Sequence, residues 1–221
     1  MKISLSKQIL FLFGLLLIIL LAGGIRLDSN PPVFWDEGWT LNVARNWITL
    51  GHYGQLNDGQ PIGPGLSAAF PVVVPVALSF RLFDVGVWQG RLPSVLYLFA
   101  SLGLLIFLAE RLYNRTIAIG TLVLLIFISG SVALHPLNSG RTVIGEMPML
   151  FFLLSGYSLL FLALRKSKWF ILPAGLLWGL AIETKAQTLP FYLVSLTIPL
   201  LVTIWKRWWQ QSLLLLSLIH I

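Results

Sequence analysis

Long uncharged apolar runs, separated by short clusters of charged residues, make up most of the chain. The runs cover about residues 8–25, 92–109, 117–138, 147–164, 169–183, 187–205 and 210–221. A helix needs about 20 predominantly apolar residues to cross a bilayer core, and most of the runs approach that length. The pattern therefore predicts six or seven transmembrane helices. Because the last run ends without a polar flank, we expect these residues to be the N-terminal part of a longer protein.

An eighth apolar run, residues 66–80, is shorter than the others and contains Pro71 and Pro75. As a straight helix it would rise only about 22 Å, against about 30 Å for the bilayer core. If this run lies in the membrane interface, the basic clusters all fall in the cytoplasm, as the positive-inside rule requires. If it crosses, the clusters after it move outside. We therefore predict that residues 26–91 form one large extracytoplasmic loop.

Two parts of this loop have recognisable patterns. Residues 37–50 place Leu41, Ala44 and Ile48 on one side of a helix, which is typical of a helix lying on a membrane surface. Residues 55–65 are rich in Gly and Pro and indicate turns. Loops of this length between spans are usually functional.

Composition agrees with a membrane protein. Apolar residues make up 57% of the chain and charged residues only 10%, whereas charged residues are about a quarter of a soluble domain. The net charge of +7 does not indicate a nucleic-acid partner, because the basic residues stand between apolar runs as membrane anchors do. No cysteine is present, which excludes a thiolate nucleophile and a Cys-based metal site in residues 1–221. We predict an all-α, polytopic transmembrane helix bundle, surrounded by membrane lipids, whose large extracytoplasmic first loop contains interfacial helices.

Seven of the eight acidic residues face outward in this topology. Acidic residues contribute little to orientation, so the asymmetry favours a cation site or a proton-transfer site on the outer face. The first candidate is Asp36-Glu37, shortly after the first span. In one interpretation Asp36 is the N-cap of the following helix. In the other, the two carboxylates beside Trp35 and Trp39 are partly desolvated, and one of them takes a proton from a hydroxyl group.

The second candidate lies at the outer end of the third span, from Arg141 to Glu146. These two residues suit a membrane-edge pair with snorkelling side chains. Alternatively, Glu146 is a second carboxylate for a divalent cation, together with Asp36, and Arg141 contacts a phosphate.

The third candidate is Glu183-Thr184-Lys185. The preceding apolar run is short, which draws both charged residues toward membrane depth, where charges are costly and usually functional. The alternative is a surface pair between Glu183 and Lys185.

These candidates occur in an order that resembles a known family. FWDEGWTLNVARNWITLGHYG follows the first span, RLPS opens the second, and ERLYNRT, GEMPML and GLAIETKA come after it. The set resembles the N-terminal half of membrane glycosyltransferases of the GT-C type, in particular the protein O-mannosyltransferase and aminoarabinose-transferase-like family. The stretch QPIGP, residues 60–64, departs from that family, which often has Lys or His next to Pro-Pro.

The resemblance implies a function and residue roles. A hexosyl or pentosyl group would pass from a polyprenyl-phosphate donor to a protein, lipid or polysaccharide acceptor, with inversion, at the outer face of the plasma (inner) membrane. Asp36 would be the catalytic base and Glu37 would support it. Glu146 matches an outer acidic position with a metal or donor role, so a divalent cation is the one cofactor expected. The donor phosphate would be bound by Lys185, with Arg141 and Arg45 as further candidates.

Two other functions stay open at this point. A transporter or flippase for a lipid-linked or anionic solute would place charges near mid-bilayer and repeat its halves, and neither pattern is visible. A non-catalytic scaffold would need no outer acidic cluster.

Overall fold

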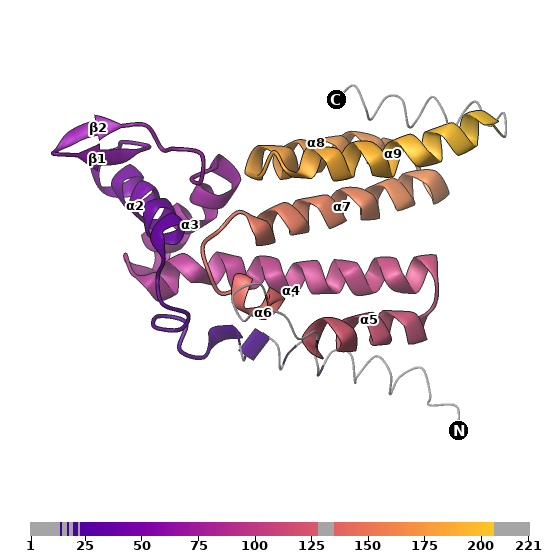
Figure 1. Ribbon diagram of the computed structural model, residues 1–221, viewed down its shortest axis with the longest axis horizontal. Helices are drawn as coiled ribbons and strands as arrows, with labels where there is room; N and C mark the ends of the chain where they lie inside the picture. The colour runs from indigo at the N-terminus through magenta and orange to yellow at the C-terminus, as the bar shows by residue number, and fades with distance from the viewer. Residues whose placement is uncertain (1–13, 15–16, 18–19, 22, 128–134, 206–221) are drawn as a thin grey trace. The chain divides into compact units, whose positions relative to one another are not determined.

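A computed structural model describes residues 14, 17, 20, 21, 23–127 and 135–205 of the chain (Figure 1). Its contacts divide the chain into two units, Met1–Pro148 and Met149–Ile221. Helices dominate both units, and the only strands in the described residues form one short hairpin.

The first unit is built around a long helix and two shorter ones that precede it. Its elements are α2 (Trp35–Leu50), β1 (Gln55–Asn57), β2 (Gln60–Ile62), α3 (Phe70–Phe83), α4 (Val87–Leu112), α5 (Arg115–Phe127) and α6 (Pro136–Ser139). Helix α2 begins after Phe34 and ends at Gly51, whose left-handed φ of 71° provides the usual helix C-terminus. Two acidic residues in its first turn complement the helix dipole.

Helices α2 and α3 pack together through small and branched side chains. Val43 and Ala44 of α2 meet Val72, Val73 and Val76 of α3 in a cluster that is almost completely buried. Helix α3 also packs against α4. With 14 residues it is about 21 Å long, shorter than the bilayer core. The interfacial placement of residues 66–80 stays a prediction.

The β1–β2 hairpin was not foreseen in the Gly/Pro-rich stretch. It turns at Asp58 and Gly59, which both have positive φ, and Asp-Gly is a favoured pair in two-residue hairpin turns. Two side-chain amides hold the hairpin to α2: Asn46 donates to the Gly54 carbonyl at 2.9 Å, and Gln55 donates to the Trp39 carbonyl at 2.7 Å. Residues 55–62 are therefore ordered as a hairpin that is held against α2.

Helix α4 runs for 26 residues, about 39 Å, and α5 packs antiparallel along it (Figure 1). Leu98, Leu102 and Leu122 are in the core between them. Helix α4 starts five residues before the expected span 92–109. Of the span expected over 117–138, the part up to Phe127 is helical in α5, residues 128–134 lie outside the described residues, and His135 is extended as the N-cap of the separate α6.

The second unit contains α7 (Glu146–Arg165), whose first residues belong to the first unit, and then η2 (Lys168–Phe170), α8 (Ile171–Thr184) and α9 (Thr188–Trp205). Trp178 of α8 lies at the centre of the second unit. It is 1% exposed and makes edge-to-face contacts with Tyr157 and Tyr192. Its indole nitrogen donates to the Leu153 carbonyl at 3.3 Å. A single large aromatic side chain therefore connects all three helices.

Two described helices, α4 and α7, are long and apolar enough to cross a membrane. Helices α7, α8 and α9 lie over the runs expected at 147–164, 169–183 and 187–205, within two residues at each end. The run at 8–25 is described only in part, and there it is helical. The run at 210–221 lies outside the described residues.

Gly156 offers a test of the packing in the second unit. A Cβ atom at this position would lie 2.4 Å from the Trp178 indole nitrogen, whereas one at Gly179 would meet no atom within 4 Å. We expect Gly156→Ala to destabilise the protein by about 1–3 kcal/mol, as overpacking does. Gly179→Ala should leave stability unchanged or raise it slightly, because Gly weakens a helix. Thermal unfolding in detergent measures both, and equal melting temperatures for the two variants would contradict the packing.

Candidate active site

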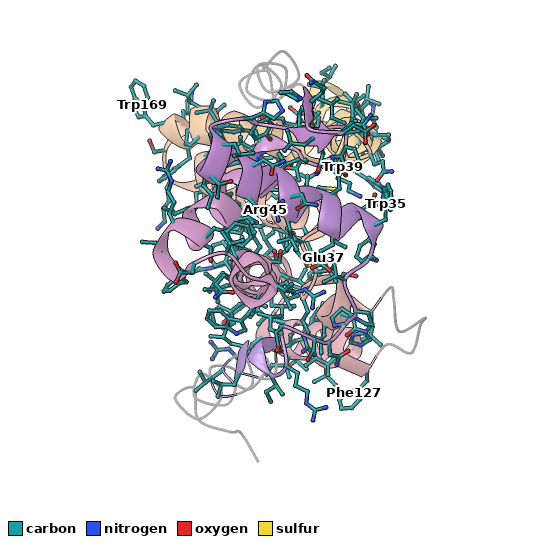
Figure 2. All side chains as sticks on the ribbon, turned by 90° about the vertical axis from the view of Figure 1, so that its left-hand side faces the viewer. Trp35, Glu37, Trp39, Arg45, Phe127 and Trp169 are labelled. Carbon is teal, nitrogen blue, oxygen red and sulfur yellow. The ribbon has the colours of Figure 1, made fainter. Side chains whose placement is uncertain are left out.

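A completely buried ion pair lies at the start of α2. Both Glu37 and Arg91 are 0% exposed, and the guanidinium meets the carboxylate through two parallel hydrogen bonds, Nε to Oε1 at 2.7 Å and Nη2 to Oε2 at 2.6 Å. Figure 2 shows α4 end-on, with Glu37 between it and α2. This fork-to-fork geometry is the strongest arrangement for an Arg–carboxylate pair.

The same pair binds two further segments of the first unit. Arg91 Nη1 donates to the Leu27 carbonyl at 2.9 Å, which lies just after the first apolar run. Glu37 Oε1 also accepts the backbone N–H of Val143 at 3.0 Å, from the loop before α7. Four segments that are distant in sequence therefore meet at two side chains.

Sequence reasoning singled out Glu37 but missed its partner. Arg91 was assigned to the end of the outer loop, whereas it lies inside α4 and is buried. Lys, Arg, Asp and Glu are almost never fully buried unless they are paired. One signal in the sequence could have identified Arg91. An arginine at the edge of an apolar run needs a carboxylate partner, and Glu37 was one of the candidates.

Asp36 has the opposite environment to Glu37, because it is exposed to solvent. Helix α2 starts at Trp35 with Phe34 as its N-cap, so the interpretation of Asp36 as the N-cap is wrong. Trp35 beside it is 80% exposed and lies 6.4 Å, between ring centroids, from the partly buried Trp39. In Figure 2 Trp35 marks the outer edge of α2. The carboxylate of Asp36 is thus accessible to solvent, on a helix whose opposite side is fixed by the buried Glu37–Arg91 pair.

Arg45 is also exposed on α2 (Figure 2). It follows Asp36 by nine residues, which is about 13 Å along a helix axis. The two side chains therefore serve different parts of any common ligand.

Arg141 lies in the loop that carries Val143, and Glu146 is the first residue of α7 after that loop. The Arg141 guanidinium donates to the Ile25 carbonyl, and partial burial lowers the pKa of Arg141, which the positive charge of nearby Arg91 lowers further. An arginine stays protonated under such conditions. Glu146 is partly buried in the first turn of α7, where a negative charge is favourable.

Lys185 belongs to the second unit. It is the C-cap residue of α8, half-buried, with its backbone N–H bonded to the Ala181 carbonyl at 3.1 Å. Glu183, two residues earlier, is exposed. The convergence of Lys185 with the residues of the first unit stays a prediction.

The arrangement of possible metal ligands is known for the part of the chain that the structure describes. No cluster of three or more His, Cys, Asp or Glu side chains there is close enough to hold a metal ion. Asp36 and Glu146 would supply only part of the six oxygen ligands that Mg²⁺ prefers.

Comparison with known proteins gives two kinds of match. A family model described as dolichyl-phosphate-mannose-protein mannosyltransferase matches residues 71–221. The matched region begins after Asp36 and Glu37 and does not include them. No curated protein matches the chain.

Two crystal structures of ArnT from Cupriavidus metallidurans, both 18% identical in sequence, have the same fold. The apo structure matches with a TM-score of 0.68 over 96% of this chain, and the structure bound to undecaprenyl phosphate with 0.65 over 97%. The chain spans 40% of the length of each. These matches confirm the fold class expected from the sequence.

Removing one partner of the buried pair should be far more harmful than removing both. We expect Arg91→Met or Glu37→Leu alone to cost about 3–5 kcal/mol, because each leaves an uncompensated buried charge. The double variant should recover much of that loss. The free energy of unfolding in mixed detergent micelles, measured for the wild type, both single variants and the double variant, gives the coupling between the two residues.

The half-exposed pair between Arg115 and Glu110, joined at 2.9 Å, is the matched control. Arg115→Met there should cost no more than about 1 kcal/mol. Additive losses at Glu37 and Arg91 would show that the two residues do not act as one unit.

Proposed function

The chain belongs to the dolichyl-phosphate-mannose-protein mannosyltransferase family of GT-C membrane glycosyltransferases, as the sequence motifs indicated, and on that basis we propose that it transfers a sugar from a polyprenyl-phosphate donor. The family match covers most of the chain, and the solved structure bound to undecaprenyl phosphate has the same fold. The acceptor is a protein, lipid or polysaccharide hydroxyl at the extracytoplasmic face of the plasma (inner) membrane.

One observation carries the assignment of the base: two adjacent carboxylates have different environments. Both carboxylate oxygens of Glu37 accept hydrogen bonds, from Arg91 and from the Val143 N–H, while Asp36 is exposed at the start of the same helix. A general base must reach its substrate, and its position must be fixed. Asp36 meets the first condition, and the Glu37 anchor meets the second.

The proposed step is a single displacement at the anomeric carbon. Asp36 accepts the proton of the acceptor hydroxyl as its oxygen bonds to that carbon. The bond from the carbon to the phosphate oxygen breaks on the opposite side, so the configuration inverts. The leaving group is the polyprenyl phosphate, which carries the released electron pair away.

The leaving phosphate needs positive charge where its own negative charge develops. Arg141, Lys185 and Arg45 are proposed for this role. The cluster of Arg141, Arg91 and Glu37 contains two guanidinium groups and one carboxylate, so an excess of one positive charge remains near the loop. A divalent cation would require Asp36 and Glu146 to share it with oxygens of the donor phosphate.

Asp36→Asn tests the base. It keeps the size of the side chain and removes its basicity, and we expect the rate of transfer to fall by about 10²–10⁴-fold. The matched control is Asp58→Asn in the hairpin turn, where Asn accepts the positive φ of 50° well. Transfer is measured on the full-length enzyme with a radiolabelled lipid-phosphate sugar.

Retention of transfer by the Asp36→Asn enzyme would remove Asp36 from the mechanism. A lipid carrier or flippase needs no such base, so lipid translocation without any transfer activity would support that alternative.

Lys185→Gln tests the phosphate contact. Loss of one charge-assisted hydrogen bond costs about 1.5–3 kcal/mol, so the donor KM should rise by about 10- to 150-fold. Lys166→Gln, at an exposed residue of the same unit, should leave it unchanged. A donor KM that does not respond to Lys185→Gln would exclude the contact.

A further inference from the structure

A small cavity of the first unit is lined in part by the segment that leads into α2, the helix that carries the candidate base. Its volume is about 230 Å³, and it is lined by Pro31, Phe34, Asn138, Ser139, Thr142 and Ile144. One wall comes from the segment that leads into α2, and the other comes from α6 and the loop after it.

The cavity is flanked in sequence by the site residues. Phe34 is two positions before Asp36, and Arg141 stands between Ser139 and Thr142. The hydrogen bond from the Val143 N–H to Glu37 Oε1 connects the two walls, since one partner follows Thr142 and the other lies in the first turn of α2. The buried ion pair therefore fixes the distance between the two walls of the cavity as well as the position of α2.

The lining combines two kinds of surface. Phe34, Pro31 and Ile144 are apolar, whereas Asn138, Ser139 and Thr142 carry amide and hydroxyl groups. Thr142 is 5% exposed and its hydroxyl donates to the Ser139 carbonyl at 3.0 Å, so its oxygen can still accept a hydrogen bond. A pyranose ring has the matching character, because its C–H faces are apolar and its edge carries hydroxyl groups.

The volume of the cavity indicates the size of the ligand. Pockets for drug-sized molecules have volumes of about 300–1,000 Å³. This cavity is smaller, and its volume suits one monosaccharide ring.

We propose that this cavity receives the glycosyl group of the donor, an inference that rests on the proposed function. A sugar seated there has its ring against Phe34 and its hydroxyl groups toward Asn138, Ser139 and Thr142. Its anomeric carbon then lies between the phosphate at Arg141 and the acceptor hydroxyl at Asp36. The cavity thereby distinguishes a loaded carrier from the bare carrier lipid.

The test compares two probes on the full-length enzyme in detergent. The first is undecaprenyl phosphate alone, and the second is the same carrier with a mannosyl or an aminoarabinosyl group. Ser139→Trp fills the cavity, and Phe34→Ala removes its aromatic wall. We expect each variant to bind the bare carrier within twofold of the wild type and the glycosylated carrier at least tenfold more weakly.

Leu78→Trp is the matched control. It fills a cavity of similar size, about 200 Å³, between α2 and α3, and it should change neither affinity. Equal weakening of both probes by Ser139→Trp and Phe34→Ala would overturn the proposal, and so would unchanged binding of the glycosylated carrier. If the wild type binds neither glycosylated carrier, the proposed function fails; if it binds one of them and the variants leave that affinity unchanged, only this inference fails.

A second measurement avoids a bulky substitution. Residues 1–221 contain no cysteine, so Ser139→Cys introduces a single thiol into this part of the chain. The glycosylated carrier should slow alkylation of that thiol at least fivefold more than the bare carrier does. Equal protection by both probes would place the sugar elsewhere.

Discussion

The first unit depends on a pair of opposite charges that water cannot reach. Once Glu37 and Arg91 are buried, each must satisfy the other, because an ionised side chain left alone in such a place costs several kcal/mol. The remaining hydrogen-bonding capacity of both groups is then directed to the backbone of Leu27 and Val143. Displacing any one of the four segments breaks a charge-assisted hydrogen bond, so they are fixed as a group.

This constraint gives two neighbouring residues of the same chemical type different environments. Successive residues on a helix point about 100° apart, so a helix that packs on one side turns Glu37 inward and Asp36 outward. The inward carboxylate is permanently occupied. The outward carboxylate keeps its capacity to accept a proton and cannot drift, because its neighbour is anchored.

The sequence was informative where local composition decides the structure. Helix α7 lies within one residue of the run expected from its apolar residues, since length and hydropathy alone fix such a helix. It was less informative where a long-range contact decides. Arg91 is the last residue of the predicted loop 26–91, and only its pairing with a residue 54 positions away explains why it is buried in α4. Within the expected third span, His135 is extended and caps α6, which hydropathy does not register. Asp36, Arg141 and Glu146 were proposed from their charge, whereas the cavity of the first unit is lined by uncharged residues that give no signal in the sequence.

The order of the two acids in the dipeptide has a consequence for how this site can vary. Exchanging them would leave composition, charge and hydropathy untouched, yet aspartate is one methylene shorter and would stop short of the Arg91 fork, while glutamate at the outer position would swing through a wider arc. An insertion of one residue before Glu37 would rotate the anchor by about 100° and turn a carboxylate away from its guanidinium. The permitted variation is therefore confined by the reach of a side chain and the pitch of a helix.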